Sequence, residues 1–461
     1  MADVDTQDLW AKWLGAVQAA ALPAGLGEGQ RFSAGSTTLN VDLGNADPTI
    51  QNYYIHGLGD VVPANSPSYS AGSSLVSAYA AFLDWIDPGA KVNPNLDSQV
   101  NLATTKLNNA QKAFNAILMQ AITAYNAAKG VMPDLPAFKD WLPTNYPSYL
   151  TANNDLIGAS GAYEQLMIQV YGPNYASLQN ARTNVGYNYA QNVLTQNKFN
   201  MAVTSGSVSP PGSQPVVIGG DTPAAPSALV SSFLPAYSLQ AFGSKYPEWQ
   251  AASVAGQNDA GASISITSST EDYSLDKSGW SASAKATLFG DFFNFSLGGS
   301  TSGGKTSINT SSSDFSLTVD FTGFGSFPIA PGAWWNSALV ALNTTKLKPG
   351  APDFFGDDGA LSGLATQVVV GFEPTVTLKM SASDYSNVKS TWQAQATTSI
   401  GIGPFRLGKL SGSANGTKQD IHYDDATASV TIGPVKSTLP VLLGVVSQRL
   451  GGSQDTGGDD E

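Results

Sequence analysis

The C-terminal half of the chain contains one motif twice, as DYSLDKSGWSASA at residues 272–284 and as DYSNVKSTWQAQA at residues 384–396. Both copies fit the frame D-Y-S-x-x-K-S-x-W-x-A-x-A, and the offset between their first positions is 112 (384 − 272 = 112). Tyr, Lys and Trp seldom recur in register by chance within sequence that is rich in Ser and Ala. The motif therefore indicates an internal duplication, which decides the fold that we predict for this half.

The flanks of the motif repeat with it. Ile264 and Ile266 alternate with Ser and Thr before the first copy, and Val376 and Leu378 alternate with polar residues before the second. This period of two is typical of half-buried antiparallel strands. A last matched strand, with Val430 in the second copy, is one residue out of step with its counterpart. We therefore predict a sandwich-like antiparallel β domain at residues 262–450, with copies at about 262–340 and 374–450.

The N-terminal part follows the helical period instead. Phe114, Ile117, Ala121 and Tyr125 recur at steps of three or four within a predicted helix at residues 97–129. Further helices are predicted at residues 5–22, 72–86, 135–141, 147–171 and 174–198. The predicted fold class is α+β. Its parts are a helical bundle at residues 1–203, a Pro/Gly-rich linker with short helices at 204–261, the β domain at 262–450 and a disordered acidic tail at 451–461.

The composition excludes several classes of function. Only 12% of the 461 residues are charged and the net charge is −13, with no Lys/Arg cluster to neutralise phosphates, so we exclude a nucleic-acid partner. Cysteine is absent, which excludes disulfide scaffolds and thiolate metal sites. No signal peptide and no membrane helix is recognisable, so we expect a protein that is soluble when made and, if it acts outside the cell, released by another route. The compartment is not indicated.

The sequence offers no catalytic constellation. His56 and His422 are the only histidines, and neither has neighbouring metal ligands. No nucleophile elbow, phosphate-binding loop or dinucleotide fingerprint occurs. We therefore expect a protein that is not an enzyme and needs no cofactor. The weakest candidate site comprises Asp353, Asp357 and Asp358, since Ca²⁺ takes such oxygens, but their spacing differs from an EF-hand loop and a solvated turn is the simpler interpretation.

The repeated motif is the first stronger candidate. If its aromatic side chains are exposed, Tyr and Trp could stack on a sugar or a lipid headgroup at two equivalent sites. If they are buried, the motif is a corner between consecutive strands, where Asp and Lys pair across a turn and Trp begins the next strand. Residue preference favours this structural corner. The residues concerned are Asp272, Tyr273, Lys277, Trp280, Asp384, Tyr385, Lys389 and Trp392.

The strands are the second candidate. Small apolar residues alternate with Ser and Thr along residues 280–321, Gly-rich turns separate the strands, and few charges interrupt them. This pattern is similar to the amphipathic hairpins that β-pore-forming proteins insert into membranes, and the segment is long enough for two strands of about 10 residues. The resemblance lies in the pattern and not in a family motif. Close packing of Ala and Ser in an ordinary sandwich is the alternative.

An aromatic segment follows the last strand of the first copy. If exposed, Phe324, Phe327, Trp334 and Trp335 would contact a membrane or a partner. If buried, they would fill the core, which is the commoner place for such residues.

These patterns lead us to expect a non-enzymatic, membrane-targeting protein of the β-pore-forming type that self-associates. Its helical part would keep it soluble or recognise a target. The alternatives are a structural or self-assembling protein, as in a filament, shell or adhesive, and a binding module for a glycan or small molecule. Hairpins that sit loosely on the body would favour insertion, whereas a closed sandwich would favour a structural or binding role.

Overall fold

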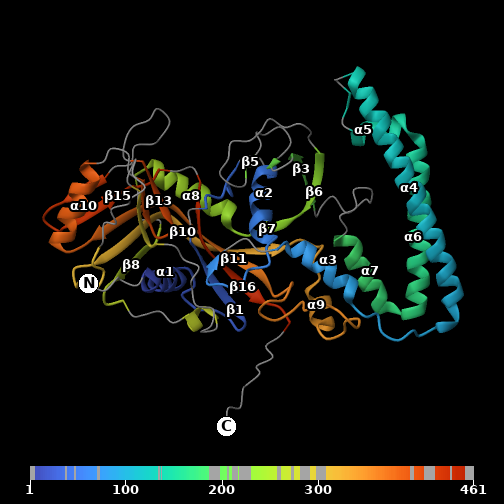
Figure 1. The fold of residues 1–461 in the computed structure, drawn as a ribbon, viewed down its shortest axis with the longest axis horizontal. Coiled ribbons are helices and arrows are strands. Elements are labelled where there is room, and N and C mark those ends of the chain that lie inside the picture. Colours follow the sequence, from blue (N-terminus) through green and yellow to red (C-terminus); the bar gives the residue numbers. More distant parts are fainter. Residues whose placement is uncertain are drawn as a thin grey trace, which may run out of the picture. The chain divides into compact units, whose positions relative to one another are not determined.

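The chain is α+β, and Figure 1 labels its helices and strands. The computed structural model describes residues 6–36, 39–45, 48–69, 73–132, 135–136, 138–185, 198–204, 207–209, 216–217, 230–256, 261–270, 275–280, 291–296, 308–394, 399–409, 421–436 and 439–451.

Most helices of the first part of the chain lie where the apolar periodicity predicts them. The helices are α1 (Thr6–Ala21), α2 (Pro48–Gly59), α3 (Leu75–Trp85), α4 (Asp97–Val131), α5 (Phe138–Asn145), α6 (Pro147–Tyr171), α7 (Pro173–Val185), α8 (Phe242–Val254), α9 (Ser337–Asn343) and α10 (Ala382–Ala394), with 3-10 helices η1 (Pro94–Leu96) and η3 (Leu275–Ser278). The sequence pattern does not predict α2, because Gly57 and Gly59 resemble loop residues. Pro48 nevertheless begins this helix, at a position where its missing N–H costs nothing.

The strands in the described part of the chain form three sheets. They are β1 (Gln30–Gly35), β2 (Ser68–Tyr69), β3 (Lys198–Thr204), β4 (Ser207–Ser209), β5 (Val216–Val217), β6 (Val230–Pro235), β7 (Tyr237–Leu239), β8 (Ser263–Thr267), β9 (Phe293–Ser296), β10 (Ser316–Pro331), β11 (Gly363–Lys379), β12 (Ser399–Ile402), β13 (Phe405–Lys409), β14 (Ile421–Asp424), β15 (Ser429–Ile432) and β16 (Val441–Arg449). The largest sheet has nine strands and is centred on the long antiparallel pair β10 and β11. β11 continues on its other side into β15 and β16, and β10 into β8 and β7.

The chain divides into two compact units. The first comprises Met1–Tyr79, Gln196–Ala333 and Pro352–Glu461, and the second comprises Ala80–Thr195 and Trp334–Ala351. Helices α1 and α2 therefore belong with the strands, whereas α4 to α7 and α9 belong to the second unit. Within the second unit, α4 packs on α6 through Phe114, Ala152 and Leu156.

Residues 204–261, for which the sequence predicts a linker with short helices, contain both strands and a helix among their described residues. β7 adds to the end of β10, where Leu239 pairs with Ile329. α8 packs on the sheet because Phe242 and Trp249 meet the aromatic ring of Phe327, with ring centroids 5.2 Å and 5.7 Å away. Aromatic packing thus places α8 in the first unit, although prolines and glycines surround it in the sequence.

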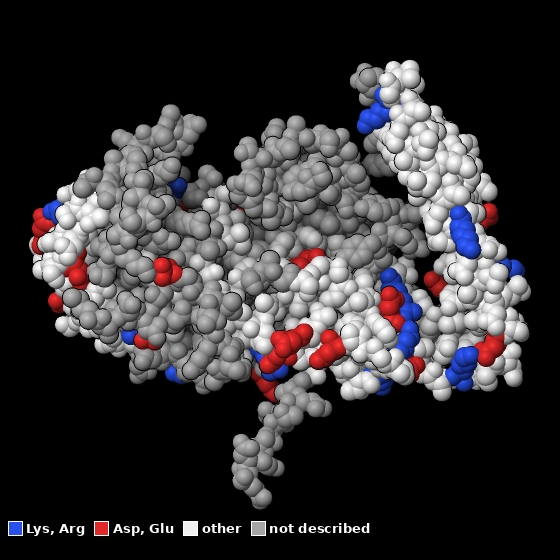
Figure 2. Space-filling model, viewed as in Figure 1, with Lys and Arg blue, Asp and Glu red and all other residues white. Residues whose placement is uncertain are grey.

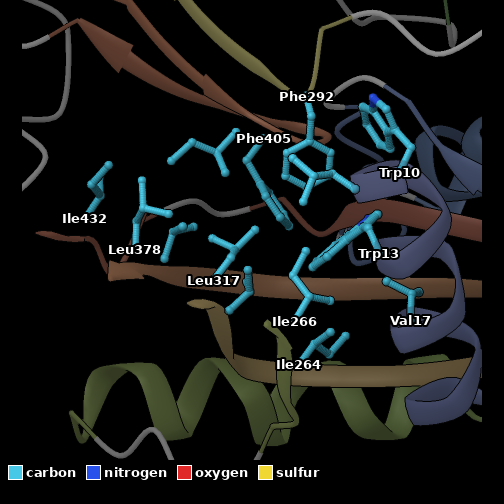
Figure 3. Packing of buried hydrophobic residues seen from close by; sticks show 14 of the residues in the cluster. Trp10, Trp13, Val17, Ile264, Ile266, Phe292, Leu317, Leu378, Phe405 and Ile432 are labelled. Atoms are coloured by element: carbon cyan, nitrogen blue, oxygen red, sulfur yellow. The ribbon is translucent and has the colours of Figure 1, made fainter. Parts of the chain in front are cut away.

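The core of the first unit lies between α1 and the sheet. Figure 3 shows Trp13 and Val17 of α1 pointing toward Ile266, Leu317 and other buried side chains of the sheet. Every second residue of β8 and of the start of β10 is buried, which is the period-two pattern that the sequence displays. The amphipathic stripe of α1 and the apolar face of the strands therefore cover one another.

Candidate functional site

Four strands of the large sheet end in one row. Thr267, the last residue of β8, pairs with Ser316, the first residue of β10. Ser316 also pairs with Lys379, the last residue of β11, and Lys379 pairs with Ser429, the first residue of β15. Two long segments connect these strands at the row: insert 1 (residues 268–315) joins β8 to β10, and insert 2 (residues 380–428) joins β11 to β15. Each insert thus begins and ends at adjacent positions of the sheet, and each carries one copy of the repeated motif.

A small sheet joins the two inserts. Its order is β13-β12-β9, which matches the order β15-β11-β10 of the strands from which these segments extend. The register also matches. Ser316 pairs with Lys379 in the large sheet, and Ser296 pairs with Ser399 in the small sheet. Along the chain, Ser296 lies 20 residues before Ser316, and Ser399 lies 20 residues after Lys379 (316 − 296 = 20; 399 − 379 = 20). The small sheet therefore keeps the register that an uninterrupted extension of β10 and β11 would have.

The register is also kept between β11 and β15 on the large sheet and β12 and β13 on the small sheet. Lys379 pairs with Ser429 and Ser399 pairs with Lys409, and the step in the numbering is again 20 on both segments (399 − 379 = 20; 429 − 409 = 20). β12 and β13 form a hairpin that turns between Ile402 and Phe405. The middle of insert 2 is thus a hairpin whose first pair, Ser399 with Lys409, is in register with β11 and β15. α10 lies between β11 and this hairpin in the chain.

The second motif copy lies on a helix, so the predicted corner between consecutive strands is wrong for that copy. In the first copy, residues 272–274 and 281–284 lie outside the described residues. The second copy forms most of α10, and η3 forms part of the first. Tyr385, Val388 and Trp392 are buried at steps of three and four, which is the stripe of a helix. The alternation of Trp392 with small residues predicts a strand instead. Asp272 and Tyr273 lie outside the described residues.

Trp280 anchors insert 1. Its side chain is buried, and its Nε1 donates a hydrogen bond of 2.7 Å to the Phe32 carbonyl oxygen on β1. The Arg31 guanidinium lies 4.8 Å from the centroid of the indole, and Arg31 Nε donates to the Gly279 carbonyl oxygen at 3.2 Å. Lys277 is exposed. Since Trp280 is enclosed by protein, it offers no platform for a sugar.

Asp425 ties α10 to the end of insert 2. Its Oδ1 accepts hydrogen bonds from the Tyr385 hydroxyl at 2.5 Å and from Lys389 Nζ at 2.6 Å. Burial, together with the bond to Asp425, raises the pKa of Tyr385 to about 12, while Lys389 and Tyr385 lower the pKa of Asp425. Asp384 does not pair with the motif lysine; its Oδ2 accepts from the Asn309 backbone N–H of insert 1 at 3.0 Å. Sequence reasoning missed Asp425, because no local pattern links it to the motif.

The acidic loop after α9 is an ion-pair site. Asp357 Oδ1 lies 2.5 Å from a guanidinium nitrogen of Arg31 and 2.9 Å from one of Arg449. The hydrogen bond from Arg31 holds the pKa of Asp357 below its usual range. Asp353 accepts from the Phe355 N–H as a turn residue does, and Asp358 is exposed. Nowhere in the described ranges do three or more His, Cys, Asp or Glu residues gather as a metal site would require, so this loop gives no support to a calcium site.

The aromatic candidates divide between interior and surface. Phe327 and Trp334 are buried, and Phe324 and Trp335 are half-buried. Phe327 packs on Trp249 of α8, and Phe324 packs on Phe321 with centroids 5.6 Å apart. Phe327 and Trp334 therefore serve the interior, as residue preference predicts.

His56 lies beside a carboxylate that caps a helix. Asp60 accepts from the Ser74 hydroxyl and from the Val76 N–H, both at 2.8 Å, at the start of α3. His56 Nε2 is 3.7 Å from Asp60, and its Nδ1 is 3.0 Å from the Pro235 carbonyl oxygen. Ser74 therefore bonds to the carboxylate and not to the imidazole, which is not the geometry of an activated nucleophile. Burial lowers the pKa of His56.

Charged side chains are scattered thinly over the described surface that Figure 2 shows, in agreement with the low charged fraction. No helix among the described residues is long and apolar enough to cross a membrane. No protein-family model, no curated protein and no solved structure matches the chain. The assignment of function therefore depends on the geometry of the inserts.

Proposed function

We propose that the protein is a non-enzymatic, membrane-targeting protein of the β-pore-forming type, in which inserts 1 and 2 extend into a membrane as β-hairpins. The observation that carries this proposal is the shared register of the two sheets. Ser316↔Lys379 and Ser296↔Ser399 belong to one continuous ladder if the residues between them become strands. Extension would then add backbone pairs at the row of strand ends. It would break the pairs of β14 with β15, because β14 belongs to insert 2, and it would keep the pairs that join β8, β10, β11 and β15.

The faces of the strands support the same proposal. Val376, Leu378 and Met380 are buried and evenly numbered, and so are Ile400 and Ile402 at the tip of insert 2. Because alternate residues of a strand face opposite sides, all five would share one face of an uninterrupted strand. Residues 392–398 continue the alternation, with Trp, Ala, Ala and Thr on that face and Gln, Gln and Thr on the other. Each insert is much longer than the two strands of about 9–11 residues that a hairpin needs to cross a bilayer.

We also infer the internal duplication from the pairing. Ile266 pairs with Leu317 in the first copy, and Leu378 pairs with Val430 in the second. The offset between the copies is 112 for the first members of these pairs and 113 for the second members (378 − 266 = 112; 430 − 317 = 113). The one-residue slip seen in the sequence thus preserves equivalent pairs. A helical bundle followed by a sandwich-like β domain, with the helical part recognising the target, remains part of this proposal.

The proposal includes self-association through β8, which is the edge strand of the first copy. In the part of the chain that the structure describes, β8 pairs only with β10. A free strand edge pairs readily with another chain. If copies of the chain repeat the β10–β11 junction, β15 of one copy would meet β8 of the next with Ser429 opposite Thr267, once β14 gives way. Successive copies would then form one extended sheet from which many hairpins project.

Dye release from vesicles tests the proposal. The protein is added to vesicles of phosphatidylcholine alone, with anionic lipid and with sterol, and the products are examined for oligomers that resist heating in detergent. We expect release together with such oligomers in at least one composition. Absence of both with every composition contradicts the proposal.

A structural, self-assembling protein is the second candidate, and the long β10–β11 pair between the two copies favours it. Electron microscopy separates the two: ordered assemblies without lipid support the structural role, and rings that need lipid support the pore. A glycan-binding role receives no support from the motif, since Trp280, Tyr385 and Trp392 are buried.

A further inference from the structure

We propose that α1 is a latch that holds both inserts on the sheet and must leave before either insert extends. This inference rests on the proposed function of the inserts and adds the element that controls them. It is carried by contacts that α1 makes with residues of both inserts.

The apolar face of α1 touches one aromatic ring from each insert. Trp10 packs edge-on against Phe292 of insert 1, with ring centroids 5.0 Å apart. Trp13 packs edge-on against Phe405 of insert 2, with centroids 5.6 Å apart. Figure 3 shows these four side chains together at the end of α1. All four are buried, so extension of either insert would remove an aromatic partner from the latch.

Polar contacts fix α1 to the first turn of insert 1. Gln18 Nε2 donates to the Lys277 carbonyl oxygen at 3.1 Å, and the Ser278 hydroxyl donates to Gln18 Oε1 at 2.9 Å. Gln18 and Ser278 are both buried, so this amide must be matched to its partners. Lys12 Nζ also donates to the Ser268 carbonyl oxygen at 3.3 Å, at the first residue of the insert.

The connection of α1 to the sheet leaves room for its release. α1 contributes no strand to the large sheet, so its departure would break none of the backbone ladders. Residues 22–29 join it to β1 and include Gly25 and Gly29 at positive φ values of 78° and 68°. A methyl group built on Gly25 would meet no neighbour within 4 Å, so the chain there is uncrowded.

Gln18→Ala tests the latch, because it removes both hydrogen bonds and leaves the tryptophans in place. Amide hydrogen exchange is followed in solution without lipid, and Ala19→Gln on the exposed side of α1 is the matched control. Loss of two buried hydrogen bonds predicts exchange about tenfold faster at residues 275–280 and 291–296, with a smaller increase at residues 399–409. Exchange at β10 and β11 should stay at the wild-type rate, and Ala19→Gln should match wild type throughout.

Two results would overturn the latch. If the inserts keep wild-type exchange in Gln18→Ala, α1 does not hold them. If exchange rises equally in β10 and β11, α1 is an ordinary part of the core. Ser278→Ala provides a second approach from the insert side, and its effect should not add to that of Gln18→Ala.

Dye release separates this inference from the proposed function. Where wild type releases dye, Gln18→Ala should release it faster, and an unchanged rate contradicts the latch. Where wild type releases no dye with any lipid, the pore proposal fails, while the exchange experiment still decides whether α1 holds the inserts.

Discussion

A disulfide between positions 296 and 399 tests the shared register in depth. The chain has no cysteine, so Ser296→Cys with Ser399→Cys creates a single bond between insert 1 and insert 2. The two residues are paired across β9 and β12. Paired Cα atoms in antiparallel strands lie about 4.5–5.5 Å apart, which falls within the range of about 4.4–6.8 Å that a disulfide spans.

The size of the stabilisation follows from the loop that the bond closes. The numbers of the two positions differ by 103 (399 − 296 = 103). For a loop of about 100 residues, the restriction of the unfolded chain corresponds to about 4.7 kcal/mol, and strain in the folded state lowers this to about 2–4 kcal/mol. The oxidised protein should therefore unfold at a higher urea concentration than the reduced protein.

Function should nevertheless survive the bond. If the inserts extend in the register that they already have, positions 296 and 399 stay paired, and the oxidised protein should release dye at the rate of the reduced protein. The single-cysteine variants control for each substitution. Loss of dye release on oxidation, with recovery in a thiol reductant, would refute the reasoning, because it would mean that the inserts separate on the way to the membrane.

Three further predictions concern the anchors of the fold. Trp280→Phe removes the hydrogen bond to Phe32 and weakens the contact with Arg31, so we expect the free energy of unfolding to fall by about 1–2 kcal/mol in urea titrations; an unchanged midpoint counts against this anchor. Because burial lowers the pKa of His56 in the fold, the unfolded chain binds the proton more readily. The contribution of His56 to the free energy of unfolding should therefore be complete above about pH 6.5 and decrease below it. His56→Gln should flatten that decrease, measured as urea midpoints at about pH 7.5 and about pH 5. Asp425→Asn should speed amide exchange in α10 and leave β1 unchanged; equal protection in wild type and variant would show that the carboxylate does not hold α10.

The strands beside the two motif copies could be predicted because their information is local. The period of two identifies β8, β10, β11 and β15, and the one-residue slip near Val430 has a direct counterpart in the pairing Leu378↔Val430 beside Ile266↔Leu317. Likewise, the stripe of Leu9, Trp10 and Trp13 defines α1, since a helix face repeats within a few residues.

The state of the motif could not be predicted, because its residues satisfy two periods at once. Trp392 alternates with Ala394 as in a strand, but Tyr385, Val388 and Trp392 also form a helical stripe, and contact with the core selects the helix in α10. The proposed function uses this same ambiguity, since it requires α10 to become a strand and the sequence of this segment fits both periods.

The polar contacts of the inserts could not be predicted from the sequence for a different reason. The partners of Gln18 and Lys389 are separated from them by 260 and 36 positions in the chain. Only the tertiary fold brings such groups together, and a polar residue on a helix gives no sign of its partner. A glutamine next to the apolar stripe of α1 was the one available signal, because a buried amide needs a specific partner.

The most direct test of the central claim is to locate residues 391–398 in the membrane-bound protein. Each position is changed in turn to cysteine in the cysteine-free chain, labelled with an environment-sensitive fluorophore, and measured with and without vesicles. If insert 2 crosses the membrane as a strand, lipid should shift the emission at the even positions 392, 394, 396 and 398 and leave the odd positions in water. Emission that does not respond to vesicles, or that responds with a period of three to four residues, would contradict the account.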